Sequence, residues 1–242
     1  MAIELNGLKL HGYLRHRSFL DGMSNGGYEQ FTQELYEKSL KPGMIVVDGG
    51  AHVGLYTLLA ARRIGIDGRV FAFEPDPYNF GALVFNVNKN HSRNIVPIRK
   101  AVSNTNDDAV FYISGGTISS SLVNRKNAEE CRQMLVRCAT LDHELCNVAL
   151  DSLLVKLDIE GAEPVALQGM NNLLQKVRSA VVIAELNPSA LRDAGLSPRD
   201  MINELKSHGF QVYFIDELGK KLIPVASTTT MQKGNLYCVK EN

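Results

Sequence analysis

The chain has 242 residues, of which 45% are hydrophobic and 21% are charged, and this composition suits a globular domain with one large core. Lysine plus arginine and aspartate plus glutamate both number 26, so the formal net charge is zero, which argues against a large nucleic-acid-binding surface. The first residues lack the basic and then apolar order of a signal peptide, and no apolar run approaches about 18 residues, the length of a membrane span. We therefore expect a cytoplasmic protein without nucleic-acid or membrane partners.

The N-terminal residues differ from the rest of the chain. Residues 1–20 alternate loosely in polarity and predict short strands or a hairpin, and the turn-forming residues at 21–27 predict a break. Residues 28–40 predict a helix, because the apolar residues there recur at helical spacing. We expect an N-terminal extension at 1–27 and one domain over 28–242.

The first half of that domain alternates strands and helices. Short apolar runs bounded by turn residues predict strands at 44–47, 69–73 and 95–98, and apolar stripes predict helices at 52–64 and 76–90. This is the pattern of a doubly wound α/β fold, in which a mostly parallel sheet carries helices on both faces.

The second half continues the same pattern after a less regular middle. Residues 114–135 are rich in serine, glycine and polar residues, and a loop of this length is typical of a lid or substrate loop. The remaining predicted elements are strands at 109–113, 135–139, 152–157, 179–184, 210–215 and 235–239, and helices at 163–176 and 198–208.

A glycine-rich turn follows the first predicted strand of the domain. In an open parallel sheet, ligands bind outside the carboxyl ends of the strands. Glycines in the sequence DGGAHVG, from Asp48 to Gly54, let the backbone approach a ligand, and the next helix offers free N–H groups to an anion. Glu74 follows the second strand, 20 residues past Gly54, and suits the two hydroxyls of a ribose. Together these features indicate a nucleoside ligand, although they do not separate a nicotinamide cofactor from S-adenosylmethionine.

An acidic block follows the strand at 152–157. Three carboxylates lie within six residues, at Asp158, Glu160 and Glu163, and they repel one another unless cations or hydrogen-bond donors face them. Glu185 follows the next strand and should converge on the same cleft as Asp158. For Glu163 the favoured interpretation is a carboxylate at a helix N-terminus, and for Glu160 this role and a role in the site are equally favoured.

Several motifs occur in the order seen in one enzyme family. They are VVDGGAHVG, FAFEPDP, the SSSL loop, ATLD at 139–142, VKLDIEGAEPVALQGM and VVIAELN. Over residues 28–239 the chain resembles the FkbM-type methyltransferases, and the VKLDIEGAE block is the most specific element. The resemblance implies a class I S-adenosylmethionine-dependent fold with a seven-stranded sheet whose last strand is antiparallel.

The resemblance also implies residue roles in binding S-adenosylmethionine: Asp48, Gly50 and Gly54 in the turn, Glu74 at the ribose, Asp76, Ala101 and Val102 near the adenine, and Asp158 beside the methionine and methyl end. Two positions depart from the family. Gly49 stands where a β-branched residue is more common, and His52 stands where the family usually has asparagine. A plain histidine at the helix N-terminus is slightly favoured for His52 over a helix cap or a contact with the cofactor.

Methyl transfer from a sulfonium to a hydroxyl requires in-line placement and removal of the hydroxyl proton. We expect O-methylation of a small molecule, such as a sugar or a polyketide-like metabolite, with Asp158, Glu160 and Glu185 as the catalytic carboxylates. A divalent metal held by Asp158, Glu185 and Asn187 is possible but not favoured.

Two other functions remain open. A nicotinamide-dependent oxidoreductase would favour G-x-G-x-x-G, but Ala51 occupies the middle glycine position. A cofactor-binding module without catalysis is the second, and intact Asp158 and Glu185 count against it. Turn residues near Asn25, Tyr28 and Glu29, around the start of the first predicted helix, can close over the cofactor. The acceptor and the oligomeric state are not predicted.

Overall fold

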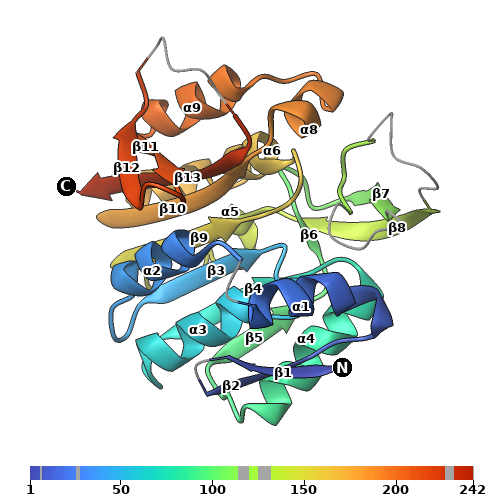
Figure 1. Cartoon of the computed structure of the whole chain (residues 1–242). Coiled ribbons are helices and arrows are strands. Elements are labelled where there is room, and N and C mark those ends of the chain that lie inside the picture. The colour runs from blue at the N-terminus through green and yellow to red at the C-terminus, as the bar shows by residue number, and fades with distance from the viewer. Residues whose placement is uncertain (6, 26–27, 114–119, 125–131, 227–231, 242) are drawn as a thin grey trace.

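The structure is a computed structural model, and it describes residues 1–5, 7–25, 28–113, 120–124, 132–226 and 232–241. An eight-stranded sheet with the order β12-β11-β13-β10-β9-β3-β4-β5 forms its centre (Figure 1). Helices cover both faces of this sheet. The doubly wound, mostly parallel α/β fold expected from the sequence is therefore confirmed.

Five neighbouring strands of the sheet are parallel: β5 (Ile95–Ile98), β4 (Arg69–Phe73), β3 (Ile45–Gly49), β9 (Ser152–Leu157) and β10 (Ser179–Leu186). The last strand, β13 (Gly234–Glu241), runs antiparallel between β10 and β11 (Gln211–Asp216). The expected number of seven strands is wrong by one, because β12 (Lys221–Pro224) pairs with β11 at the edge. β12 is mostly exposed and contains lysine and proline, so its sequence lacks the alternation that identifies a strand.

The two faces of the sheet pack against different helices, because successive side chains of a strand point to opposite faces. Val46 and Leu154 belong to one buried cluster, whereas Val47 and Val155 belong to the other. The first cluster includes residues of α1 (Arg17–Ser24), α2 (Gln30–Ser39), α3 (Leu55–Ile64) and α4 (Pro77–Lys89). The second includes residues of α5 (Leu141–Glu144), α6 (Glu163–Gln168), α7 (Asn171–Lys176), α8 (Pro188–Asp193) and α9 (Pro198–Ser207).

Two differences from the predicted helices have local causes. The helix expected over 163–176 is two helices, α6 and α7, and Gly169 separates them. Gly169 lies against the backbone of Ser103, where an added Cβ would stand 2.0 Å from the carbonyl oxygen. α8 has no counterpart among the predicted elements, since its six residues are too short to display a helical period.

The N-terminal residues form the expected hairpin, β1 (Ala2–Leu5) and β2 (Leu8–His11). A short 3-10 helix, η1 (Leu14–His16), and α1 follow. The break expected at residues 21–27 is wrong in its first part, because α1 continues through Ser24 with Leu20 and Met23 buried on one helical face.

Asparagine side chains of α4 fix β2 in place. Asn86 donates to the carbonyl of His11 at 2.9 Å and accepts its N–H at 2.8 Å, and Asn90 makes the same pair of bonds with Lys9. The N-terminal segment therefore packs on the helix that follows β4. The expected division between residues 27 and 28 stays a prediction.

A second, smaller sheet stands apart from the main one in Figure 1. It consists of β6 (Ala101–Val102), β7 (Asp108–Ile113) and β8 (Arg132–Ala139). Most of the expected lid or substrate loop over 114–135 lies outside the described residues, and only residues 120–124 and 132–135 of it are placed. Among the described residues, no helix has the length and apolar character needed to cross a membrane.

Two glycines with left-handed backbone allow the free-energy cost of the backbone conformation to be compared with the cost of a steric clash. Gly50 has φ 82° and Gly43 has φ 78°, but an added Cβ meets the Asp158 carbonyl oxygen at 2.0 Å only at Gly50. We expect Gly43→Ala to lower the free energy of unfolding by about 1–2 kcal/mol, the cost of left-handed backbone. Gly50→Ala should cost at least about 2 kcal/mol more, because the turn must move away from Asp158. Urea unfolding of both variants measures this, and equal losses would contradict the close approach.

Candidate active site

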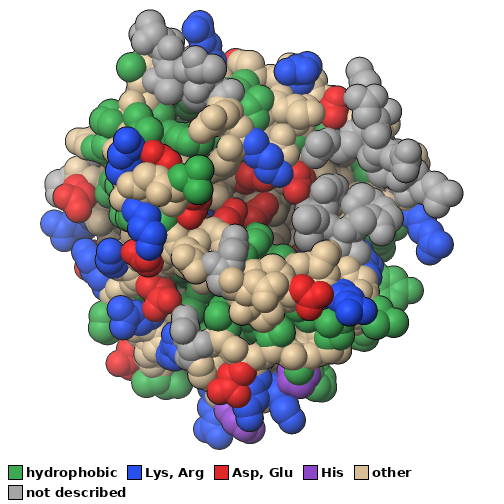
Figure 2. All heavy atoms as spheres, viewed as in Figure 1, with side chains coloured by type: hydrophobic (Ala, Val, Ile, Leu, Met, Phe, Trp, Pro, Cys, Tyr) green, Lys and Arg blue, Asp and Glu red, His purple; other side chains and the backbone are tan. Residues whose placement is uncertain are grey.

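A cavity of about 310 Å³ opens at the carboxyl ends of β3, β4, β9 and β10, the edge at which an open parallel sheet binds ligands. Acidic side chains gather in a hollow near the middle of the face shown in Figure 2. Nine of the predicted site residues line the cavity: Asp48, Gly50, His52, Glu74, Ala101, Val102, Asp158, Glu160 and Glu185. Gly54, Asp76 and Asn187 do not line it.

The glycine turn is held against the acidic turn that follows β9. Asp48 is buried and accepts a hydrogen bond from the Thr57 hydroxyl of α3. Burial raises the pKa of Asp48 to about 6, although Thr57 and the ammonium of Lys156 oppose this shift. Because Gly50 has no side chain, its backbone reaches that of Asp158, which brings the two turns to one wall of the cavity.

His52 lies before the helix and not in it, because α3 begins at Leu55 and not at residue 52 as expected. Its backbone is left-handed, with φ 52°. The ring makes edge contacts with His16 and Phe19, at centroid distances of 4.9 and 4.6 Å. Burial lowers the pKa of His52 to about 3, so the imidazole is neutral, and its buried Nε2 has no partner among the described residues.

Glu74 directly follows β4 and is 4% exposed. Its two carboxylate oxygens accept the backbone N–H groups of His52 at 2.8 Å and Asp76 at 2.9 Å. Burial raises the pKa of Glu74 to about 8, and these two backbone bonds counteract the rise. The side chain of Asn79 also donates a hydrogen bond to Glu74. A carboxylate has about four acceptor positions, so Glu74 can still accept a hydroxyl donor in the cavity.

Asp76 and Gly54 support the site from outside the cavity lining. Asp76 caps α4, since its carboxylate accepts the N–H groups of Tyr78 and Asn79, and it also pairs with Arg15 at 3.1 Å. Gly54 is the residue before α3, and an added Cβ would meet a side chain of α4 at 2.8 Å. These two residues therefore position the two helices that flank the cavity.

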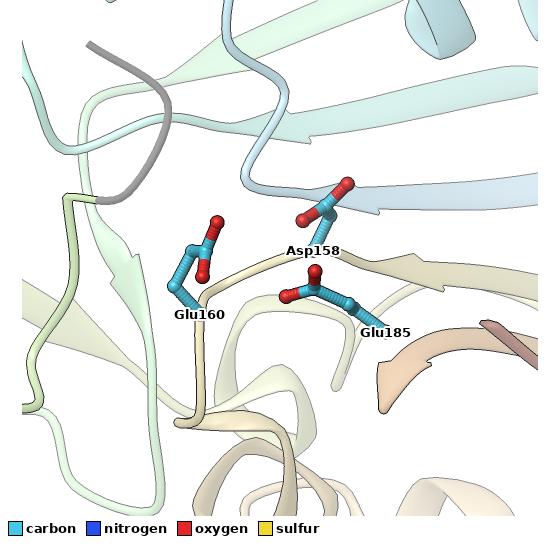
Figure 3. Close-up of side chains that lie close together, drawn as sticks. All are labelled: Asp158, Glu160 and Glu185. Atoms are coloured by element: carbon cyan, nitrogen blue, oxygen red, sulfur yellow. The ribbon is translucent and has the colours of Figure 1, made fainter. Parts of the chain in front are cut away.

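Three carboxylates converge from the ends of β9 and β10 (Figure 3). Asp158, Glu160 and Glu185 each have an oxygen within 4.8 Å of an oxygen of the other two. Burial raises the pKa of Glu185, and the negative charges of Asp158 and Glu160 raise it further. Glu185 Oε2 is buried and has no hydrogen-bond partner among the described residues.

Two lysines balance part of this charge. Lys156 is fully buried, with its ammonium 3.3 Å from Asp158 Oδ2 and 5.1 Å from the centre of the Tyr56 ring. Lys233 lies 2.9 Å from Glu185 Oε1. The place of Lys156 at the acidic turn follows from strand alternation, but nothing in the sequence points to Lys233, which is far from Glu185 along the chain.

Tyr28 and Glu29 line the cavity next to α2, as their place before the first helix suggested. Glu29 accepts hydrogen bonds from the Tyr56 hydroxyl at 2.8 Å and from the Asn235 side-chain amide at 2.9 Å. Glu29 thereby adds a further carboxylate to the cavity.

The residue Asn187 of the metal alternative already has hydrogen-bond partners. Its side-chain oxygen caps α8, and its nitrogen donates to Glu160 Oε2 at 3.2 Å. The carboxylate of Glu160 lies together with those of Asp158 and Glu185. Side-chain donors already face each of the three carboxylates: Lys156, Asn187 and Lys233.

The buried carboxyl of Glu74 predicts a pH dependence of stability. Since its pKa is about 8 in the folded protein and 4.5 by itself, the folded state binds more protons between these values, and stability falls as the pH rises through this window. One such group contributes a slope of up to about 1.4 kcal/mol per pH unit. We expect Glu74→Gln to flatten the loss of unfolding free energy from pH 5 to 8, measured by urea unfolding without ligand. Glu4→Gln, at an exposed position of β1, is the control, and an unchanged slope in Glu74→Gln would contradict the assignment.

Comparison with known proteins identifies the family. Residues 48–212 match the methyltransferase FkbM domain. Hexuronic acid methyltransferase AglP of Haloferax volcanii is 28% identical over 175 residues, and the match covers 72% of this chain and 66% of that protein, just under two thirds of its length.

Two solved structures share the fold. A protein of Clostridium thermocellum described as an rRNA methylase has a TM-score of 0.51 at 12% identity, over 87% of this chain and 95% of its own. A Streptococcus mutans protein described as a methyltransferase, solved with S-adenosylhomocysteine (SAH), has a TM-score of 0.51 at 9% identity, over 87% and 96%. Because the domain match spans most of the sequence, the chain belongs to the methyltransferase FkbM domain family, and it has a Rossmann-like fold.

Proposed function

We propose that this methyltransferase moves the methyl group of S-adenosylmethionine to a hydroxyl of a small molecule, with a sugar as the first candidate. The observation that carries the proposal is the convergence of Asp158, Glu160 and Glu185 on a cavity whose other wall is the glycine turn with Glu74. The hexuronic acid methyltransferase relative supports a sugar-like acceptor.

The nucleoside half of the cofactor belongs beside Glu74 in this proposal. Glu74 accepts the ribose hydroxyls, Gly50 lets the backbone approach, and Ala101 and Val102 form the apolar side for the adenine. Asp48 and Asp158 face the methionine end, where the cofactor carries an ammonium and a sulfonium. Asp76 acts indirectly, by fixing the start of α4.

The acceptor half belongs beside Glu160 and Glu185. In the reaction, the acceptor oxygen bonds to the methyl carbon while the carbon–sulfur bond breaks, and the sulfur keeps the electron pair as a neutral thioether. The hydroxyl proton passes to a carboxylate. A raised pKa makes Glu185 a stronger base than an ordinary carboxylate, which suits it to this step.

Other functions fit less well. Membership of a methyltransferase family leaves a nicotinamide-dependent oxidoreductase without support. A small-molecule acceptor, the lack of a nucleic-acid partner and a cytoplasmic location stay predictions, and one relative by fold is described as an rRNA methylase.

Transfer of labelled methyl groups tests the proposal. With a panel of neutral sugars, uronic acids, amino sugars and polyketide-like alcohols, we expect the wild type to methylate at least one acceptor class. Glu185→Gln should lower kcat at least about 100-fold, the usual contribution of a positioned base, with cofactor affinity within about threefold of wild type. Asp158→Asn should weaken cofactor binding at least about tenfold, because it loses a charge-assisted contact.

Glu34→Gln, in an exposed part of α2, is the control for both variants and should leave the two constants unchanged. Full activity in both site variants would exclude the mechanism. Cofactor binding without turnover on any acceptor would support a binding module without catalysis.

Metal removal tests the remaining alternative. Because the chain's own donors face all three carboxylates, we expect methyl transfer to continue within about twofold of its initial rate after exhaustive treatment with EDTA. Loss of activity that Mg²⁺ restores would instead assign a cation to Asp158, Glu160 and Glu185.

A further inference from the structure

Ser121 ties the segment after β7 to the acidic turn. Its side chain is buried, and it lies between Ser120 and Leu122, which both line the cavity. Its backbone exchanges two hydrogen bonds with Tyr112 of β7, at 2.8 and 3.0 Å. The Ser121 hydroxyl therefore sits at a fixed place beside the site.

That hydroxyl faces the carbonyl groups of the acidic turn. Ser121 Oγ lies 2.9 Å from the carbonyl oxygen of Ile159 and 3.0 Å from that of Glu160. The same Oγ accepts the backbone N–H of Val123 at 3.1 Å. A hydroxyl has one proton to donate, so Ser121 shares it between two carbonyls of one turn while Val123 orients the oxygen.

The turn needs such anchors because its backbone is unusual. Glu160 has φ 54°, a left-handed conformation that is unfavourable for a residue with a Cβ. Glu163 holds the other side of the turn, since its buried carboxylate accepts the N–H groups of Ile159 at 2.9 Å and Gly161 at 2.8 Å. Ser121 and Glu163 thus hold the carbonyl and amide groups of the same turn.

The direction of the Glu160 carboxylate depends on this backbone. In the left-handed conformation Glu160 points into the cavity beside Asp158 and Glu185, as Figure 3 shows. Asn187 fixes the far end of the side chain, at 3.2 Å from Oε2. If the turn relaxed, the Glu160 carboxylate would leave the other two.

We propose that Ser121 is a positioning residue for methyl transfer. Its hydroxyl fixes the backbone of Glu160 so that the carboxylate faces the acceptor, and it anchors Ser120 and Leu122 as a wall of the acceptor pocket. This inference rests on the proposed function of the site.

The test compares Ser121→Ala with Ser121→Thr, which keeps the hydroxyl. We expect Ser121→Ala to keep its affinity for SAH within about threefold, to lower kcat at least about tenfold and to raise KM for the acceptor. Ser121→Thr should restore kcat to within about threefold of the wild type. Activity of Ser121→Ala within threefold of the wild type would overturn the proposal.

Ser39→Ala is the matched control. Ser39 is also a buried serine that donates to a backbone carbonyl, that of Leu35 at 2.7 Å, but it lies on α2 and does not line the cavity. Each alanine variant removes the hydrogen bonds of one buried hydroxyl and should lower Tm by at least about 2–4 °C, and only Ser121→Ala should lose activity. If Ser121→Ala and Ser39→Ala lost equal activity, Ser121 would have only a structural role and the proposal would be overturned.

A crystal structure of Ser121→Ala with SAH tests the inference without any acceptor. We expect the φ of Glu160 to leave the left-handed region, or its carboxylate to move away from Glu185. An unchanged Glu160 would overturn the inference even if the wild type methylated no acceptor on the panel. Failure of the proposed function, an inactive wild type, is thereby distinguished from failure of this inference.

Discussion

The buried ammonium of Lys156 is the interaction on which the candidate site depends. Its strand delivers the residue to the centre of the sheet with no exposed surface, where an isolated charge would be very costly. Burial lowers the pKa of Lys156, but Asp158, Glu29 and Asp48 raise it more, so the net shift is upward and the amine stays charged. One cation thus serves carboxylates from three separate segments of the chain.

The remaining acidic groups are held in two different ways. Glu163 is buried, and both of its carboxylate oxygens accept hydrogen bonds from backbone N–H groups of the acidic turn. Burial raises the pKa of Glu163 to about 7. One oxygen of Glu185 has no donor among the described residues. Burial and the negative neighbours together raise the pKa of Glu185, so its deprotonated form is a stronger base than an ordinary carboxylate. A carboxylate that stabilises the turn, Glu163, therefore lies close to a carboxylate proposed to accept a proton, Glu185.

The sequence predicts the strands and turns of the site better than the directions of its side chains. β4, β5 and β9 begin and end at the predicted residues, because continuous apolar runs bounded by turn residues mark buried strands. Asn187 and Glu160 both follow the carboxyl ends of strands, so the sequence predicts that they lie at the same edge of the sheet. Their roles differ: the Asn187 oxygen caps α8, whereas Glu160 has a left-handed backbone and its carboxylate lines the cavity.

The order Asp76-Pro77 indicates a helix that begins at Pro77 with Asp76 as its N-cap, since proline is common at the first helical position. The contact of Lys233 with Glu185 has no such signal, because it arises only from packing of the chain's end onto the sheet.

The unusual histidine in the glycine turn has a cause in the N-terminal segment. His16 is buried, accepts the N–H of Tyr13 at Nδ1 and contacts the Asn79 oxygen at Nε2, so its ring is fixed in the neutral form with the proton on Nε2. That ring and Phe19 of α1 form a wall against which the neutral ring of His52 packs edge to face. A left-handed position that would otherwise favour glycine can hold a histidine here, because the buried contacts offset the backbone cost. The N-terminal segment and the glycine turn therefore depend on each other, and loss of the segment would leave His52 strained and uncovered at the cavity.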